Sequence, residues 1–356
     1  MNGKNETHAE NIKNTTTQNE LNFQQMLQTL PLTAKFAEDD WYVWGGSMVR
    51  TDDGVCHLLY ARWPIKCGFS AWLTHSEIAH ATAENPLGPY KFQNVALPDR
   101  GGEYWDGHTT HNPTAIQVGE KFYLYYMGNH GDKKVTKEDL NWVHRNNQRI
   151  GVAVADHPAG PWKRFDKPVL DVTPGSWDDL VVSNPSATQG ADGKFLMVYK
   201  GVTKGSEADL PFGKKVLHGV AVADSPLGPF KKYPQPIFTY GDTKFPAEDP
   251  FVWYAENQYH AIVKDCSGHF TNAGQSLALW QSKDGINWQL ASHPLVTKTQ
   301  VLWENNKLQK LVSLERPQLW LDNEKPAVLF CAACDSLKNS YNLHIPLNND
   351  YKIKET

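Results

Sequence analysis

A short proline-anchored motif recurs along the sequence, and this repeat constrains the fold more than any other feature. Four segments place polar residues before a proline and an alternating apolar run after it: His111-Asn112-Pro113, Ser183-Asn184-Pro185, Glu248-Asp249-Pro250 and Glu315-Arg316-Pro317. The prolines are 72, 65 and 67 residues apart. Counting 67 residues back from Pro113 gives Gly46, in a segment (44–50) with the same pattern but no proline. The chain therefore contains five repeats.

Each repeat also contains further short apolar runs that end at turn residues. A second, strongly apolar run follows the motif, at residues 121–127, 194–200, 258–264 and 326–331. A third run is clear at residues 149–155 and 217–223, and a fourth is expected after the turns at 88–90, 160–162, 228–230 and 285–288. Several short strands per repeat, separated by glycine and proline turns, are typical of propeller blades. We therefore predict an all-β fold, a five-bladed β-propeller with four strands in each blade.

The fifth repeat ends near Pro346 after only three strands. Closing the ring therefore needs a strand from the other end of the chain. Residues 30–44, which precede the first repeat, are expected to supply this strand.

The N-terminal segment differs in composition from the repeats. Residues 1–18 are polar with almost nothing to bury, which predicts disorder. Residues 20–30 place Phe23, Met26, Leu27 and Leu30 at helical spacing, so we expect a short helix that docks on the propeller or on a second subunit. We divide the chain into an N-terminal extension, residues 1–37, and a propeller domain, residues 38–356.

Charge and hydropathy exclude several classes of partner. The net charge is −4 and no basic run is longer than two residues, so we expect no nucleic acid. No apolar stretch approaches the roughly 18 residues of a membrane helix, so we expect no membrane partner. Residues 1–17 lack the apolar core of a signal peptide, which predicts a cytoplasmic protein, or a periplasmic or secreted one if a signal has been removed. The 13 Trp and 14 Tyr suit pleated strands and also sugar-stacking platforms.

The repeat also predicts where the chemistry lies. The innermost strand of each blade lines the axis of a propeller, so the starts of the five inner strands converge at one end of the channel. The motifs bring together His111, Asn112, Ser183, Asn184, Glu248, Asp249, Glu315 and Arg316. Burying several charged groups in one pocket is unfavourable unless they have a function. We expect the active site here.

These motifs resemble those of the five-bladed glycosidases of glycoside hydrolase family 43 and, more loosely, family 117, over roughly residues 40–350. The family 43 pattern has Asp-Pro in the first blade, His-Ala-Pro in the second, Asp-Pro in the third and Glu-Gly-Pro in the fourth. The resemblance implies that Glu248 is the general acid and that His111 is the second-blade histidine. The resemblance to family 117 also implies a homodimer formed through the N-terminal helical segment, residues 20–30. Two positions depart from the pattern. Asn184 replaces the third-blade Asp, and the first-blade Asp, the general base, falls on Gly45-Gly46.

The missing base leaves several carboxylates as candidates for the second catalytic group. Inverting hydrolysis needs two carboxyl groups roughly 6.5–9.5 Å apart, and retaining hydrolysis needs roughly 5–5.5 Å. Asp249 or Glu315 could act with Glu248, and Asp178 or Asp179 could approach from a loop. Asp249 could instead be a strand-start residue that accepts backbone hydrogen bonds.

Substrate-binding candidates come from the motifs, one loop and the strand ends. The loop at residues 101–111 precedes the second inner strand, and Trp105 could stack on a sugar while Asp106 and His108 reach its hydroxyls. A rigid turn capped by Asp and Thr is the alternative for this loop. The other predicted binding residues are Asn112, Asn184, Arg316, Lys264 and Arg62, and Lys200 also stands where a strand ends.

Nothing in the sequence predicts a required cofactor. No closely spaced zinc motif is present, although His75, His80, His218, His108 and His111 leave room for a structural divalent cation in the central channel. Cys331-Ala-Ala-Cys334 lies in an apolar run without a second pair, which favours buried thiols.

The sequence favours an exo-acting glycoside hydrolase that releases a terminal sugar from a plant or algal oligosaccharide by general acid/base catalysis. Two alternatives stay open. One is a polysaccharide lyase acting on a uronate through Tyr104, His108, His111 and Arg316. The other is a glycan-binding propeller without activity.

Overall fold

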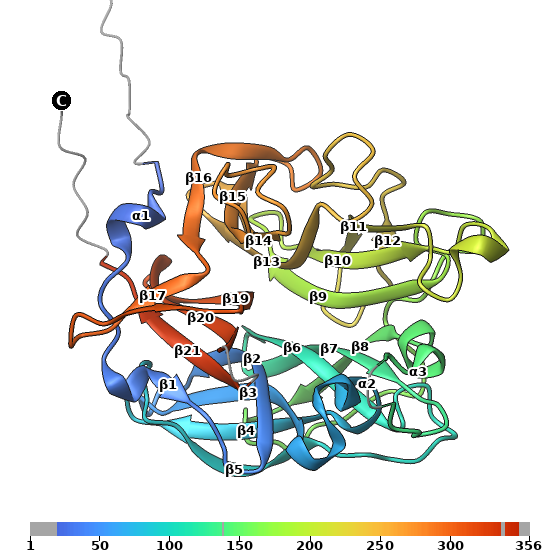
Figure 1. The fold of residues 1–356 in the computed structure, drawn as a ribbon, viewed down its shortest axis with the longest axis horizontal. Coiled ribbons are helices and arrows are strands. Elements are labelled where there is room, and N and C mark those ends of the chain that lie inside the picture. Colours follow the sequence, from blue (N-terminus) through green and yellow to red (C-terminus); the bar gives the residue numbers. More distant parts are fainter. Residues whose placement is uncertain (1–19, 137–138, 336–338, 349–356) are drawn as a thin grey trace, which may run out of the picture.

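Five sheets lie around a common axis in the computed structural model, which describes residues 20–136, 139–335 and 339–348 (Figure 1). The innermost strands of the five sheets contact one another in a closed ring, in the order β2, β6, β9, β13 and β19. This arrangement confirms the predicted five-bladed β-propeller.

The first three blades follow the chain. The first contains β2 (Trp41–Arg50), β3 (Cys56–Pro64), β4 (Glu77–Ala83) and β5 (Lys91–Leu97). The second contains β6 (Thr109–Val118), β7 (Lys121–Asn129) and β8 (Arg149–Ala155). The third contains β9 (Val181–Gln189), β10 (Phe195–Thr203), β11 (Lys215–Ala223) and β12 (Lys231–Lys232).

The last two blades complete the ring. The fourth contains β13 (Ala247–Ala255), β14 (Gln258–Asp265), β15 (Ser276–Ser282) and β16 (Gln289–Lys298). The fifth contains β19 (Ser313–Asp322), β20 (Lys325–Cys334), β21 (Ser340–Pro346) and β1 (Lys35–Phe36). A separate hairpin, β17 (Gln300–Leu302) and β18 (Leu308–Lys310), connects them.

Ring closure occurs as the strand count requires. In β1, Lys35 and Phe36 pair with Leu343 and Asn342 of β21. The fourth strand of the last blade therefore comes from the segment before the first repeat, and it lies just before residue 38, where we placed the start of the propeller. A strand contributed from the other end of the chain ties the two ends of the ring together.

The second blade differs from the predicted four strands. Its expected fourth strand is reduced to two isolated bridges with β8, Lys163 with Val154 and Leu170 with Ile150. Between these bridges, Arg164 pairs with Asp106, and Pro168 follows, which has no N–H to donate to a ladder.

The predicted N-terminal helix is shorter than its apolar spacing indicates. The helix α1 spans only Phe23–Met26, and beyond it the backbone N–H groups of Gln28 and Leu30 donate to the carbonyls of Pro346 and Leu302. These bonds with the propeller replace the helical ones. The apolar side chains of the segment are buried against the fourth and fifth blades of the same chain. The predicted disordered residues 1–18 lie outside the described residues.

The core is divided into layers between neighbouring blades. Buried apolar clusters fill the five inter-blade spaces, and each draws its side chains from two adjacent sheets. The second strands are almost wholly buried because they face a neighbour on both sides. Two short helices, α2 (Trp72–His75) and α3 (Trp142–Asn146), stand in connections at the end of the ring where the inner strands begin. In the described part of the chain, no helix has the length and apolar character needed to cross a membrane.

Candidate active site

A β-bulge interrupts each inner strand at the residue before the anchoring proline, or before Gly46 in the first blade. The five bulged residues have positive φ angles close to 50°: Gly45, Asn112, Asn184, Asp249 and Arg316. Residues other than glycine rarely adopt this conformation, and a bulge redirects the side chain it carries. In the four blades other than the first, where the bulged residue is Gly45, the motif therefore turns one side chain toward the axis.

The bulged side chains form a buried polar chain across the axis. The Asn112 Nδ2 donates to Asn184 Oδ1 at 2.8 Å, and the Asn184 Nδ2 donates to Asp249 Oδ1 at 2.5 Å. An Arg316 Nη1 lies 3.6 Å from the same Asp249 oxygen, and Arg316 is only 1% exposed. Contacts with Asn184 and Arg316 therefore hold the Asp249 carboxylate in place, and it has little freedom to act on a substrate.

Gly45, the bulged residue of the first blade, lies against the Arg316 side chain. A Cβ added to Gly45 would lie 3.2 Å from Cγ of Arg316 and 3.3 Å from its Cβ. The Arg316 side chain therefore occupies the space next to the position where the family 43 pattern has its base. The buried Arg316 of the fifth blade therefore lies beside the position at which the family 43 pattern has the first-blade Asp.

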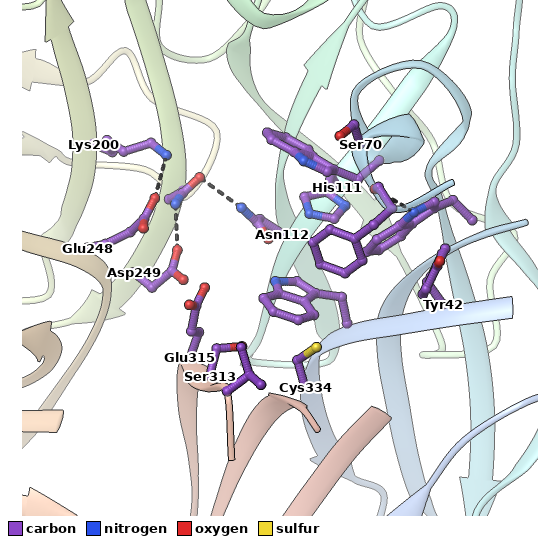
Figure 2. Close-up of a pocket in the computed structure, with 16 residues that line it drawn as sticks. Tyr42, Ser70, His111, Asn112, Lys200, Glu248, Asp249, Ser313, Glu315 and Cys334 are labelled. Atoms are coloured by element: carbon purple, nitrogen blue, oxygen red, sulfur yellow. Dashed lines mark hydrogen bonds and ion pairs between the residues drawn. The ribbon is translucent and has the colours of Figure 1, made fainter. Parts of the chain in front are cut away.

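A cavity of about 860 Å³ opens at this end of the axis, and Figure 2 shows its two unlike walls. All five blades contribute to the lining: Tyr42, Trp44, Trp63, Phe69, Ser70, Trp72, His111, Asn112, Asn184, Lys200, Glu248, Asp249, Val312, Ser313, Glu315 and Cys334. This volume is in the range of small-molecule sites, about 300–1,000 Å³. The predicted convergence of His111, Asn112, Asn184, Glu248, Asp249 and Glu315 at one pocket agrees with this lining.

One wall is aromatic and comes from the first blade and the connection after β3. Trp63 packs edge-on against Trp44 and Phe69, and its indole N–H donates to the carbonyl of Phe69 at 2.9 Å. Tyr42 and Trp72 extend this wall. We did not predict these residues as site residues, although three aromatic residues in the four positions before Gly45 were a usable signal.

The opposite wall carries paired charges. Lys200 Nζ lies 3.0 Å from Glu248 Oε1, and Lys264 Nζ lies 2.5 Å from Glu315 Oε1. The side chains of Glu248 and Glu315 are 20% and 17% exposed, whereas that of Asp249 is 4% exposed. One carboxylate oxygen of each of the three lies within 4.8 Å of the others. Glu248 and Glu315 are therefore the carboxylates that a molecule in the cavity can reach.

The surroundings move the pKa values of these two carboxyl groups in opposite directions. Burial raises the pKa of Glu248, but Lys200 and Lys264 outweigh it and hold this pKa below its usual range. Burial, together with the negative charges of Glu248 and Asp249, raises the pKa of Glu315 to about 7 against the opposing effect of Lys264. Groups whose environments separate their pKa values in this way suit the acid and base roles of one reaction.

His111 lies against the aromatic wall. Its ring contacts those of Trp63 and Trp72 at centroid distances of 5.6 and 5.1 Å, and its Nδ1 lies 2.7 Å from Ser76 Oγ. Burial, assisted by the positive charges of Arg316 and Lys200, lowers the pKa of His111 well below its usual value. The neutral ring can hydrogen-bond a hydroxyl group but is poorly suited to deliver a proton.

Trp105 and Asp106, which we predicted to bind substrate, lie outside the lining of the cavity. The Trp105 ring stacks on Tyr126 at 5.9 Å, and the fully buried Asp106 accepts from the Tyr126 hydroxyl at 2.6 Å and pairs with Arg100. These contacts fasten the loop at residues 101–108 to the second blade.

The third blade contains an equivalent set of contacts, and we call this Trp-Asp arrangement a latch. Trp177 stacks on Tyr199 at 5.8 Å, and the buried Asp178 accepts from the Tyr199 hydroxyl at 3.0 Å and pairs with Lys232. The shared Trp-Asp pair at 105–106 and 177–178 was the sequence signal for a structural element. Asp178 is therefore not available as a catalytic base, and Asp179, whose Oδ1 accepts from the Lys204 backbone N–H, lies outside the cavity lining.

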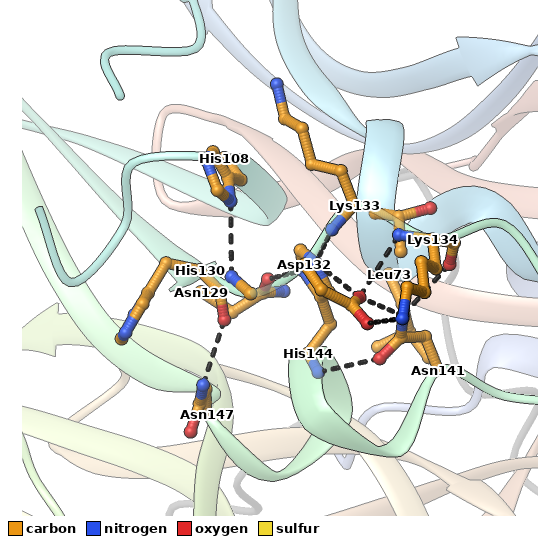
Figure 3. Close-up of polar contacts among 12 residues, drawn as sticks. Leu73, His108, Asn129, His130, Asp132, Lys133, Lys134, Asn141, His144 and Asn147 are labelled. Atoms are coloured by element: carbon orange, nitrogen blue, oxygen red, sulfur yellow. Dashed lines mark hydrogen bonds and ion pairs between the residues drawn. The ribbon is translucent and has the colours of Figure 1, made fainter. Parts of the chain in front are cut away.

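Two further predicted binding residues also have structural roles. Arg62 pairs with Glu38 and Glu77 at 2.7 and 3.0 Å and lies against the rings of Trp41 and Phe92. His108 accepts from the Gly131 N–H at 3.2 Å within a network of polar contacts (Figure 3), and it lies outside the cavity lining. Lys264 and Arg316 lie behind the lining and act on its carboxylates.

The described residues contain one group of His, Cys, Asp and Glu side chains close enough to share a metal ion, namely Glu248, Asp249 and Glu315. Each of these carboxylates already faces a lysine or an arginine, and these positive charges oppose the binding of a cation. The five histidines considered as channel ligands form no such group, since His80, for example, pairs with His57 within the first blade at 2.9 Å.

Comparisons with known proteins rest on structure, because no family model and no curated protein matches the sequence. A family 117 glycoside hydrolase from the marine bacterium Zobellia galactanivorans shares 18% identity over 92% of this chain and 91% of its own, with a TM-score of 0.61. A second solved structure, named only as a glycoside hydrolase, shares 14% identity over 94% of this chain and 96% of its own, with a TM-score of 0.66. A GH43 β-xylosidase/α-arabinofuranosidase from a compost microbial metagenome, in complex with xylotriose, shares 15% identity over 88% of this chain and 94% of its own, with a TM-score of 0.57. The protein therefore has the five-bladed propeller fold found in glycoside hydrolases of families 43 and 117.

Proposed function

We propose that the protein is a glycoside hydrolase that releases a terminal sugar in the axial cavity. The observation that carries this proposal is the aromatic wall facing two accessible carboxyl groups with separated pKa values. Aromatic rings pack against the apolar faces of sugars, and hydrolysis of a glycoside needs one protonated and one ionised carboxyl group. The shared fold of family 43 and 117 enzymes supports the same conclusion.

The charges around the two carboxyl groups favour a different general acid from Glu248, the residue that the resemblance implies. Glu315, whose pKa is raised to about 7, is the general acid, and Glu248, which Lys200 keeps ionised, is the nucleophile. Their close carboxylate oxygens, within 4.8 Å, favour a retaining reaction over an inverting one, which needs roughly 6.5–9.5 Å.

The reaction then proceeds in two steps. The Glu248 carboxylate attacks the anomeric carbon while the bond to the leaving oxygen breaks and that oxygen takes the proton of Glu315. In the second step Glu315 takes a proton from water, the water oxygen attacks the anomeric carbon, and the bond to Glu248 breaks. We assign Asn112, Asn184 and His111, which line the cavity, the role of hydrogen-bonding sugar hydroxyls.

The closed inner end of the cavity supports exo action. The buried chain of Asn112, Asn184, Asp249 and Arg316 spans the axis, so a long glycan has no path through the ring. A pocket that is closed at its inner end suits the end of a glycan chain.

The test is a screen of the wild type, Glu315→Gln and Glu248→Gln against plant and algal oligosaccharides, with released sugar measured by chromatography. Each variant should lose activity by about 10²-fold or more, since general acid catalysis alone contributes about 10²–10⁴-fold. Glu77→Gln is a matched control, because Glu77 is a part-buried carboxylate paired with Arg62 outside the cavity. Proton NMR of the first product should show the anomer of the substrate.

Several outcomes would contradict the proposal. Glycan binding by calorimetry without release of sugar indicates a binding propeller. A product that absorbs as an unsaturated uronate indicates a lyase, although Tyr104, His108 and Arg316 lie outside the cavity lining. Initial formation of the inverted anomer refutes the retaining mechanism.

A further inference from the structure

The lining of the axial cavity extends further toward its open end, the mouth, along the fifth and first blades than along the others. At β19 the lining runs inward from Val312 through Ser313 to Glu315, and in β2 it runs inward from Tyr42 to Trp44. The other three blades line the cavity only at the level of the motifs, with His111, Asn112, Asn184, Lys200, Glu248 and Asp249. The fifth and first blades, with the connection after β3, therefore form the part of the cavity nearer the mouth.

This outer part of the cavity is apolar and uncharged. Val312 is 59% exposed, and its position is fixed because its backbone N–H donates to the carbonyl of Cys334 at 2.8 Å. Phe69 is 37% exposed, and its ring packs edge-on against that of Tyr42 at 5.2 Å. Among the described residues that line this outer part, none carries a charge. Exposed apolar side chains gathered at a cavity are typical of a binding surface for an apolar group.

The catalytic groups direct the leaving group toward the same part of the cavity. A general acid must come within about 2.6–3.2 Å of the leaving oxygen, and Glu315 lies in the fifth blade directly inward of Ser313. Figure 2 shows Glu315, Ser313 and Cys334 together at this blade. Glu248 of the fourth blade attacks the anomeric carbon from the side opposite the bond that breaks, so the leaving group points away from the fourth blade.

We propose that Val312, Phe69 and Tyr42 form a subsite for the leaving group, and that this subsite takes an uncharged ring with an apolar face. The inference rests on the proposed function, because it uses the role of Glu315, but it names a class of leaving group that the hydrolase assignment leaves open. The ring of a second neutral sugar and a cyclic or aromatic aglycone share this chemistry. Either ring removes the exposed apolar side chains from water when it binds, which favours binding. Val312 is a specificity residue with no part in the bond-breaking steps.

The test compares three substrates that carry the same terminal sugar, the one that the oligosaccharide screen releases, or binds if it releases none. They are its methyl glycoside, its cyclohexyl glycoside and a disaccharide in which it is linked to a second neutral sugar. Methanol and cyclohexanol are both aliphatic alcohols, so these two leaving groups differ chiefly in the ring. The wild type should cleave the cyclohexyl glycoside with a kcat/KM at least about fourfold above that of the methyl glycoside.

Replacing Val312 with Ser removes the exposed methyl groups from the subsite. The ratio of kcat/KM for the cyclohexyl glycoside to that for the methyl glycoside should fall about 4- to 15-fold, mostly through KM, which corresponds to the loss of one to two buried methyl groups. Val143→Ser is the matched control, because Val143 is a valine on α3 that is 53% exposed and lies outside the cavity lining. Its ratio should equal that of the wild type.

The outcomes separate the subsite from the hydrolase assignment. Release of sugar from all three substrates with equal kcat/KM, or a ratio that Val312→Ser leaves unchanged, overturns the subsite and leaves the hydrolase intact. If no sugar is released but calorimetry shows tighter binding of the cyclohexyl glycoside, weakened in Val312→Ser, the subsite stands and the hydrolase is overturned. Absence of both release and ring-dependent binding overturns the two together. A disaccharide cleaved faster than the cyclohexyl glycoside, with the same sensitivity to Val312→Ser, assigns the subsite to a sugar, and the reverse order assigns it to an aglycone.

Discussion

Replacing Lys264 with Met tests whether Glu315 is the general acid. The Lys264 Nζ lies 2.5 Å from Glu315 Oε1, and the lysine side chain is only 12% exposed. Its positive charge is the main influence that lowers the pKa of Glu315 against burial. Methionine keeps the length of the side chain but removes the charge, so the protonated form of Glu315 becomes more favourable.

The size of the shift follows from the lost charge-assisted contact. Hydrogen bonds to charged groups contribute about 1.5–3 kcal/mol, and one pKa unit corresponds to about 1.4 kcal/mol. The pKa of Glu315, about 7 in the wild type, should therefore rise by about one to two units in Lys264→Met. A general acid is active when protonated, so the alkaline limb of the activity profile should move to higher pH by the same amount.

The assay is kcat/KM for release of the terminal sugar between pH 4 and 10, which reports the groups of the free enzyme. Lys200→Met is the matched control, because Lys200 pairs with Glu248 at 3.0 Å in the same wall. Loss of Lys200 raises the pKa of Glu248, so the acid limb should move to higher pH. Lys264 also lowers the pKa of Glu248, and a smaller upward shift of the acid limb is expected in Lys264→Met.

An alkaline limb that stays within about 0.3 pH units of the wild type in Lys264→Met would refute the assignment of Glu315 as the acid. If Lys200→Met moved the alkaline limb and Lys264→Met moved the acid limb, Glu248 would be the acid and the roles would be exchanged.

Three further outcomes separate structural from functional residues. Asp106→Ala should destabilise the fold by about 3–5 kcal/mol in urea unfolding, because Arg100 loses its buried partner. The KM of this variant should equal that of the wild type. A changed KM at unchanged stability would instead indicate that Asp106 belongs to the substrate site. Trp72→Ala should raise KM about 2- to 12-fold with little loss of stability, and an unchanged KM would remove the aromatic wall from substrate binding. Burial lowers the pKa values of His57 and His80 to about 4, so the folded state binds fewer protons than the unfolded state between about pH 6.5 and 4. The free energy of unfolding should therefore decrease as the pH is lowered from about 6.5 to 4, by up to about 3 kcal/mol per histidine, and a slope unchanged in His80→Gln would contradict this origin.

Most of the fold could be predicted from the repeat, because each motif performs the same local task in every blade. A residue that accepts a positive φ, followed by a proline and an alternating run, makes a bulged inner strand wherever it occurs. The strand count of the last repeat required a closing strand, and β1 supplies it. The same symmetry placed His111, Glu248 and Glu315 at one end of the axis before any contact was known.

The direction of side chains outside the motifs depended on the tertiary structure. Trp105 and Asp106 read as a sugar-binding pair, yet their contacts with Tyr126 of β7 and with Arg100 turn them into a latch. The sequence contains the residues of this latch but not the neighbouring strand that decides which way they face.

The chemistry of the site likewise depended on neighbours from other blades. Glu248 and Glu315 are the same residue type at the same repeat position, and the sequence alone cannot separate them. Their pKa values diverge because Lys200 reaches Glu248 from the third blade, whereas burial and two nearby carboxylates dominate at Glu315. Local motifs determine where a backbone bends and which side chain it presents, since those depend on short-range sterics. The protonation state of a buried group depends on every charge around it, and only the closed ring brings those charges together.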